Sequence, residues 1–263
     1  MHPIILRLGP LTIYSFGLMM ALAFLAAAYL LGKELERKGY DSEIASSLVL
    51  WAAVGGLGGA RLWLVVADWQ RFLADPWGAL FSGAGFVWYG GLLGGAVAVG
   101  WAAKHYYNLD FLRIADSVAP GLALAHGIGR IGCQLAGDGD WGSVTTLPWG
   151  MAYENAIIGW DYPPGVVVHP TPIYETVIYF VIAGLLWSWR TREQPEGTTF
   201  ARYLILSAIA RFLVEFVRIN QALWLDLTAA QWTSVVLALV GVGILFSIRR
   251  TATEVVAATS QNR

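Results

Sequence analysis

The chain has 263 residues, of which 57% are hydrophobic and only 13% are charged, and its formal net charge is −1. Soluble domains carry about 25% charged residues, so this composition predicts a membrane protein, and the near-neutral charge gives no reason to expect a nucleic-acid partner. The single cysteine, Cys133, excludes an internal disulfide framework, and four histidines without His-x-x-x-His spacing predict no metal site and no cofactor.

Seven apolar segments are each long enough to cross a bilayer, which takes about 20 helical residues. They lie at roughly 12–32, 44–67, 84–103, 113–135, 172–189, 200–218 and 228–248. The first is too long for a signal peptide and lacks its basic flank, so we expect it to remain as a helix. With no internal repeat and no Gly/Ser-rich linker, the pattern predicts an all-α polytopic membrane protein with about seven transmembrane helices in one integral membrane domain, 1–263.

The distribution of Lys and Arg between the loops predicts the orientation, because cytoplasmic loops carry more of them. One side holds eleven: Lys33, Arg37, Lys38, Lys104, Arg113, Arg190, Arg192, Arg202, Arg249, Arg250 and Arg263. The other side holds three: Arg7, Arg71 and Arg218. The pattern therefore predicts a cytoplasmic C-terminus and, with seven spans, an external N-terminus.

The longest connection, 136–170, falls on the external side and is acidic and aromatic. It contains no Lys or Arg, but it contains Asp138, Asp140, Glu154, Asp161, Trp141, Trp149, Trp160 and Tyr162. Amphipathic aromatic rings favour the headgroup layer. We therefore predict a partly structured loop region that lies on the outer leaflet.

Ionisable residues fall inside several predicted spans, and this orientation places four of them, each from a different span, in the outer half of the membrane. They are Arg61, Arg130, Glu175 and Arg211. Each could extend to the outer headgroups, or together they could line a polar cavity. Glu215 lies four residues after Arg211 and can pair with it, whereas Arg130 has no acidic residue at i±3 or i±4.

Glycines surround two of these arginines: Gly55, Gly56, Gly58 and Gly59 precede Arg61, and Gly127, Gly129 and Gly132 flank Arg130. Such glycines let membrane helices pack closely, and they also leave room for a ligand beside the guanidinium. The planar guanidinium of arginine can donate two parallel hydrogen bonds to a phosphate group. The pattern therefore predicts that an anionic phospholipid binds on the outer side.

Five stretches, in order, resemble the prolipoprotein diacylglyceryl transferase family. They are GGARLWLV (58–65), YGGLLGG (89–95), GRIGCQLAGDGDWG (129–142), HPTPIYE (169–175) and RFLVEFVR (211–218). The resemblance implies a multi-pass enzyme of the bacterial inner membrane with a periplasmic N-terminus. It also implies transfer of the diacylglyceryl group of phosphatidylglycerol to the lipobox cysteine of a prolipoprotein.

By matching position, Arg130 resembles the family's phospholipid-binding arginine and Arg211 its second essential arginine. The candidate catalytic residues are Arg130, Arg211, Tyr89, His126, Glu175 and Glu215. The candidate substrate-binding residues are Arg130, Arg61, Gly142, Asp138 and Asp140.

The chain departs from the family pattern at three places in these motifs. Tyr89 stands where the family usually has histidine, Cys133 stands where it has asparagine, and one extra residue gives both Asp138 and Asp140. Tyr89 could accept a proton, orient substrate or anchor at the interface. His126, four residues before Arg130, could accept the proton or be a buried neutral histidine. Cys133 is expected to be a small packing residue.

Two other classes of protein share features with this sequence. An intramembrane aspartyl protease needs two aspartates that lie side by side and share a proton. The two candidate motifs, Tyr40-Asp41 and Gly137–Asp140, are predicted on the cytoplasmic and external sides, so this class is excluded. A non-catalytic phospholipid-binding or transport protein stays open as the alternative. Transporters favour repeats and polar groups at the midplane, and the charges here lie on one side.

Overall fold

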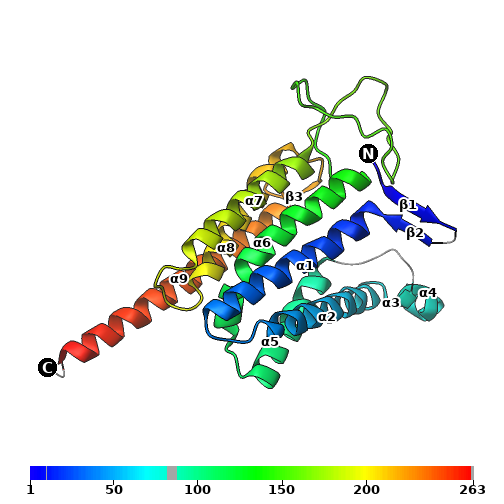
Figure 1. Cartoon of the computed structure of the whole chain (residues 1–263). Helices are drawn as coiled ribbons and strands as arrows, with labels where there is room; N and C mark the ends of the chain where they lie inside the picture. The colour runs from blue at the N-terminus through cyan, green and yellow to red at the C-terminus, as the bar shows by residue number, and fades with distance from the viewer. Residues whose placement is uncertain (10, 82–87, 262–263) are drawn as a thin grey trace. The chain divides into compact units, whose positions relative to one another are not determined.

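A computed structural model describes residues 1–9, 11–81 and 88–261, and it is mostly helical (Figure 1). The chain divides into two compact units, which are treated separately below. Unit 1 combines Met1–Leu30 with Ala115–Arg263, and unit 2 is Leu31–Ile114.

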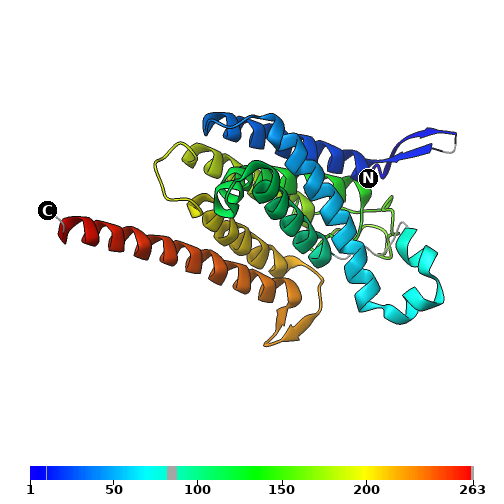
Figure 2. The same ribbon diagram turned by 90° about the horizontal axis from the view of Figure 1, so that it is seen from below.

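Unit 1 carries most of the helices. In chain order it holds β1 (Ile4–Leu8), β2 (Leu11–Tyr14), the first part of α1 (Ser15–Arg37), most of α6 (Phe111–Ala136), α7 (Thr171–Trp189), α8 (Thr198–Val214), the 3-10 helix η1 (Glu215–Val217), β3 (Ala222–Trp224), β4 (Leu227–Thr228) and α9 (Ala229–Gln261). Helix α8 packs against both α7 and α9 (Figures 1 and 2). A hydrophobic core of unit 1 is formed by buried residues of α6, α7 and α8: Ala123, Tyr179, Ile182, Ala183, Leu186 and Ala210. The strands form two short antiparallel hairpins.

Local chemistry explains where α7 and α8 begin. Pro172 lies in the first turn of α7, where a missing N–H costs no helical hydrogen bond. Helix α8 follows Gly197, which has a φ of 92°. The buried carboxylate of Asp116 on α6 accepts hydrogen bonds from the backbone N–H groups of Gly197 and Phe200, each at 2.7 Å. It thereby supplies the acceptors that the start of a helix needs.

Unit 2 is built on two helices whose backbones nearly touch. It holds α2 (Glu43–Ala67), α3 (Trp69–Ala74), α4 (Pro76–Phe81) and α5 (Trp88–Tyr107), and α2 packs along α5. A Cβ on Gly59 would lie 2.3 Å from the carbonyl oxygen of Gly90, and one on Gly94 would lie 2.3 Å from that of Gly55. No larger residue fits at these contacts, so the glycines here serve close helix packing.

Each of the seven predicted segments corresponds in sequence to a helix, although residues 84–87 of the third segment lie outside the described residues. Among the described residues, four helices are long and apolar enough to span a membrane: Ser15–Arg37, Glu43–Ala67, Thr171–Trp189 and Ala229–Arg250. The prediction of a helical membrane protein is confirmed at this level. The sequence patterns did not predict the hairpins, α3 or α4, because each is too short to produce a clear periodicity.

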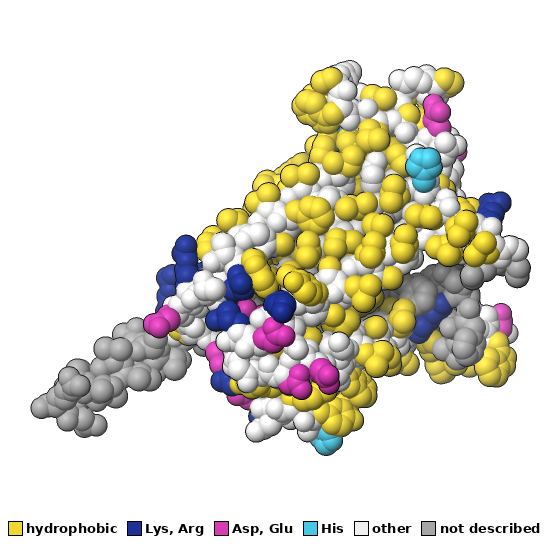
Figure 3. Space-filling view, in the orientation of Figure 1, with side chains coloured by type: hydrophobic (Ala, Val, Ile, Leu, Met, Phe, Trp, Pro, Cys, Tyr) yellow, Lys and Arg dark blue, Asp and Glu magenta, His cyan; other side chains and the backbone are white. Residues whose placement is uncertain are grey.

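The outer surface of the helices in unit 1 is apolar. Leu25 on α1, Val181 on α7 and Leu239 on α9 are 66%, 56% and 66% exposed. Hydrophobic side chains also cover much of the face shown in Figure 3, over α1, α6 and α7. Such a surface is disfavoured in water and matches the hydrocarbon of a bilayer, so these helices have lipid as their solvent.

Candidate functional site: a buried network of arginines and carboxylates

Six charged side chains meet in unit 1 and are called here the charge network. They come from α6, the 137–170 connection, α7, α8, η1 and the residue after η1: Arg130, Asp140, Glu175, Arg211, Glu215 and Arg218. Five of them were predicted as site residues, and the structure brings those five together.

Glu175 lies at the centre of the charge network. Its Oε2 is 2.9 Å from Nε of Arg130, and its Oε1 is 3.3 Å from Nη1 of Arg211. Nη1 of Arg218 is 3.7 Å from Oε2. The Glu175 side chain is only 1% exposed. A buried carboxylate is tolerated only when paired, and the three guanidiniums around Glu175 provide that pairing while Glu175 in turn fixes their positions.

Glu215 anchors the other end of Arg211. Its Oε2 is 2.8 Å from Nη2 of Arg211, which is the i,i+4 pair that the sequence predicted. Its Oε1 accepts hydrogen bonds from Nδ2 of Asn220 and Oγ1 of Thr228, both at 2.7 Å. Glu215 is therefore held by an ion pair and by two neutral donors near the second hairpin.

Asp140 joins the charge network from the connection after α6. One oxygen of its carboxylate accepts a hydrogen bond from Nη1 of Arg130, and the other oxygen accepts one from Nη2 of Arg218. Burial by itself would raise the pKa of Asp140, but the positive charges of Arg130 and Arg218 outweigh it and hold the pKa below its ordinary value. Arg130 therefore has acidic partners, although none lies at i±3 or i±4 in its own helix.

Gly142 permits the close approach that brings the segment after Asp140 to η1 and Arg218. Its N–H donates to the carbonyl of His169 at 2.8 Å, and it forms an antiparallel bridge with Arg218. The next residue, Ser143, donates its N–H to the carbonyl of Val217 at 2.8 Å. A Cβ on Gly142 would lie 2.3 Å from that Val217 oxygen, so this position requires glycine.

His126 contacts the charge network through Arg130. Nε of Arg130 donates to Nε2 of His126 at 3.4 Å. The imidazole also stacks on Tyr179, with ring centroids 3.7 Å apart and an interplanar angle of 11°. The contact with Arg130 uses the lone pair of Nε2, which a general base would need. A base role for His126 would therefore require this contact to open.

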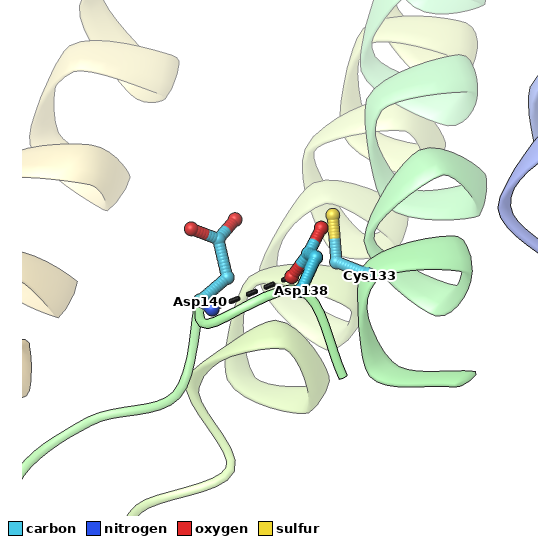
Figure 4. Close-up of side chains that lie close together, drawn as sticks. All are labelled: Cys133, Asp138 and Asp140. Atoms are coloured by element: carbon cyan, nitrogen blue, oxygen red, sulfur yellow. Dashed lines mark hydrogen bonds between the residues drawn. The ribbon is translucent and has the colours of Figure 1, made fainter. Parts of the chain in front are cut away.

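Asp138 lies beside Cys133 (Figure 4), and the Sγ of Cys133 is 3.8 Å from Nη1 of Arg130. Figure 4 shows its carboxylate next to the Cys133 sulfur, while the Asp140 carboxylate stands apart. Asp138 accepts the backbone N–H of Asp140 at 3.3 Å. Ligand atoms of Cys133, Asp138 and Asp140 lie within 4.8 Å of one another. The two guanidiniums on Asp140 disfavour a cation there, so this group supports no metal site.

Two predicted site residues belong to unit 2. Arg61 is half-buried on α2, and Tyr89 is in the first turn of α5, with its side chain outside the described part of the structure. The predicted substrate-binding role of Arg61 and the predicted catalytic role of Tyr89 stay predictions.

Arg218 is a site residue that the sequence patterns did not predict, because it comes at the end of its predicted span and counts among the three basic residues of the external side. Its side chain is only 6% exposed. Its Nε and Nη1 are buried and make no hydrogen bond with the described residues. The sequence does contain a feature that points to Arg218: its spacing from Arg211 and Glu215 puts the three residues on one helix face.

Comparison with known proteins gives a consistent result over nearly the whole chain. A family model described as prolipoprotein diacylglyceryl transferase matches residues 3–247. A phosphatidylglycerol–prolipoprotein diacylglyceryl transferase of Clostridium tetani is 35% identical over 218 residues, which cover 83% of this chain and 86% of the relative. Relatives of the same name from Clostridium perfringens (numbered 2) and Gloeobacter violaceus are 31% and 30% identical, over 91% and 95% of this chain and 92% and 94% of their own lengths. The chain belongs to the prolipoprotein diacylglyceryl transferase family.

Proposed function

We propose that this chain transfers the diacylglyceryl group of phosphatidylglycerol to the lipobox cysteine of a prolipoprotein. The relatives carry the name of this activity. The observation that supports it most directly is the meeting of Arg130 and Arg211 on the two oxygens of the buried Glu175. Arginine is the side chain best suited to a phosphate group in a partly buried site, and this pair belongs to two of the family motifs.

The proposed reaction is a direct displacement. The thiolate sulfur of the lipobox cysteine attacks the glyceryl carbon that carries the phosphate. A carbon–sulfur bond forms, the carbon–oxygen bond breaks, and glycerol phosphate leaves with the bonding electrons. The thiol proton passes to a base. Because an unperturbed thiol has a pKa of about 8.5, the site must assist this deprotonation, and no covalent intermediate on the enzyme is needed.

Each predicted residue has a place in this reaction. Arg130 and Arg211 stabilise the charge that develops on the departing phosphate. Glu175 and Glu215 orient those guanidiniums, and Arg61 adds a further cation for the lipid headgroup. Tyr89 and His126 are the candidates for accepting the thiol proton. Residues at the external connection complete the substrate-binding site: Asp138, Asp140 and Gly142.

The proposal includes a membrane topology. Seven helices cross the bacterial inner membrane, the N-terminus is periplasmic and the C-terminus is cytoplasmic. This arrangement rests on eleven against three basic residues in the loops. Reporter fusions at Lys38, Lys104 and Gln194 should give cytoplasmic signals, and fusions at Asp75 and Asn155 periplasmic signals. A periplasmic signal at Lys104 would contradict the seven-helix arrangement.

Turnover in a membrane tests the activity itself. The full-length protein is reconstituted in vesicles of phosphatidylglycerol with a lipobox peptide, and the peptide mass and released glycerol phosphate are measured. We expect the peptide to gain one diacylglyceryl group for each glycerol phosphate released, and vesicles of phosphatidylcholine to give no product. Retention of phosphatidylglycerol without any transfer would instead identify a non-catalytic phospholipid-binding protein.

A further inference from the structure

The charge network is electrically balanced before any substrate binds. Three guanidiniums, of Arg130, Arg211 and Arg218, face three carboxylates, of Asp140, Glu175 and Glu215. A phosphate placed on Arg130 would add a negative charge to a partly buried neutral cluster. Because an uncompensated charge in such a site is costly, phosphate binding calls for one carboxylate to leave its arginines.

Of the three carboxylates, Asp140 is the one that can leave. Its side chain is 29% exposed, whereas those of Glu175 and Glu215 are 1% and 0% exposed. Glu175 is fixed in the first turns of α7, and Glu215 is held by additional hydrogen bonds from neutral donors. Asp140 instead follows Gly137 and Gly139, which have φ values of 64° and 92°. Asp140 therefore lies in a non-helical connection, and of the three carboxylates it is the least restrained by a helix and by burial.

Arg218 is short of acceptors in this arrangement. Only its Nη2 is hydrogen-bonded within the described structure, to Asp140, while its Nε and Nη1 are buried without such a bond. The nearest carboxylate oxygens, on Glu215 and Glu175, are each 3.7 Å away. Buried donors without acceptors are unfavourable. A phosphate group has several acceptor oxygens and could satisfy donors that one carboxylate cannot.

We propose that the Asp140 carboxylate occupies the phosphate position in the free protein, and that a bound phosphate displaces it from Arg130 and Arg218. Arg218 thereby becomes a third phosphate-binding residue. A phosphodiester carries one negative charge, as the Asp140 carboxylate does, so its exchange with Asp140 leaves the net charge of the site unchanged. The identity of the phosphate as a phosphatidylglycerol headgroup rests on the proposed function. Displacement of Asp140 by phosphate as such does not.

Because Asp140 competes with the ligand, removing its charge should tighten phosphate binding. Binding of glycerol 1-phosphate to the purified full-length protein in detergent is measured by calorimetry for wild type, Asp140→Asn and Arg218→Gln. The control is Glu154→Gln, which removes one charge from an exposed position of the same connection. We expect binding about tenfold tighter for Asp140→Asn and about tenfold weaker for Arg218→Gln, the scale of one charged hydrogen bond. The control should match wild type. Weaker or unchanged binding in Asp140→Asn would overturn the proposal.

A measurement on the wild-type protein avoids dependence on a variant that does not fold. Carbodiimide labels accessible carboxylates, and mass spectrometry locates the label. We expect labelling of Asp140 to increase on addition of glycerol 1-phosphate while labelling of Glu154 stays constant. Decreased or constant labelling of Asp140 would sink the proposal.

The same labelling with lipid nanodiscs distinguishes the source of the phosphate. Increased Asp140 labelling in phosphatidylglycerol, relative to phosphatidylcholine, identifies a lipid headgroup, whereas an increase with glycerol 1-phosphate alone identifies a site for free phosphate esters. Transfer by the wild-type protein without any change at Asp140 would reject this inference and leave the proposed function standing. A response at Asp140 without transfer would reject the proposed function alone.

Discussion

Glu175 on α7 lies with its Oε2 2.9 Å from Nε of Arg130 on α6. Its second oxygen pairs with Arg211 on α8, 3.3 Å away. One buried carboxylate thus links three helices that are far apart in the sequence, and the position of each guanidinium depends on it.

Replacing Glu175 should therefore destabilise the protein as well as inactivate it. Glu175→Gln removes the negative charge and leaves the guanidiniums of Arg130 and Arg211 without their shared partner. Breaking a buried ion pair in this way costs about 3–5 kcal/mol. We expect a clearly lower thermal midpoint of the detergent-solubilised protein and loss of transfer activity. Glu154→Gln is the matched control, and an unchanged midpoint in Glu175→Gln would show that the pair contributes no stability.

Arg130→Lys tests whether the shape of the guanidinium matters beyond its charge. Lysine keeps the charge but cannot form the planar two-pronged contact with phosphate. The loss should be roughly 2–4 kcal/mol of transition-state stabilisation, similar to removal of one oxyanion donor. We expect most of the activity to be lost in a protein that still inserts and folds, and Arg130→Ala to lose phosphatidylglycerol during purification. Wild-type turnover in Arg130→Lys would move the phosphate site toward Arg211 and Arg61.

Gly142→Ala should break the attachment between the 137–170 connection and the η1 segment with Arg218. The new methyl group would lie 2.3 Å from the Val217 carbonyl oxygen, where backbone atoms must move. Because Asp140 and Arg218 meet through this attachment, we expect a loss of activity accompanied by a lower thermal midpoint. Gly184→Ala on α7 is the control, since its Cβ would meet no described atom within 4 Å. Equal activity of the two variants would contradict the requirement for glycine at position 142.

The general base is tested by a pair of variants. Tyr89→Phe removes only a hydroxyl group, and His126→Gln removes the titratable ring while keeping polarity. A true general base contributes about 10²–10⁴-fold to the rate. Since Nε2 of His126 already accepts a hydrogen bond from Arg130, we expect the larger rate loss in Tyr89→Phe. Near-normal turnover in Tyr89→Phe, measured with the lipobox peptide, would exclude that role for Tyr89.

The ionisation of Asp140 predicts a specific pH dependence of stability. The pKa of Asp140 is depressed in the folded protein, below the ordinary value of about 3.9 for an unfolded chain. A depressed carboxyl group contributes stability above its unfolded pKa and loses that contribution as the pH falls through its folded pKa. Asp140→Asn should therefore have a lower thermal midpoint than wild type at pH 7. The two midpoints should converge as the pH falls below about 4. A difference that is constant down to acid pH would show that the charge of Asp140 is not involved.

Much of the architecture follows from the sequence because hydrophobic length and charge act locally. The predicted segment 172–189 corresponds to α7 (Thr171–Trp189), and 44–67 corresponds to α2 (Glu43–Ala67). The pairing of Arg211 with Glu215 also follows from spacing alone, since residues four apart share a helix face. Short elements such as β3 and β4 were not predicted, because two or three residues carry no periodic signal.

Hydrophobic segments and motifs in the sequence are enough to predict a helical membrane protein, its family resemblance, and the costly charges of Arg130 and Arg211 in apolar segments. The carboxylates that meet these two arginines can be identified only in the folded chain. Asp140 reaches Arg130 and Arg218 because Gly142 lets the connection after α6 approach Val217, and Glu175 meets two arginines because α7 places it beside α6 and α8. The difference lies in how far apart in the sequence the interacting residues are. Hydrophobicity and helical spacing are properties of neighbouring residues, whereas pairing between helices depends on close contacts among segments that are distant in the chain.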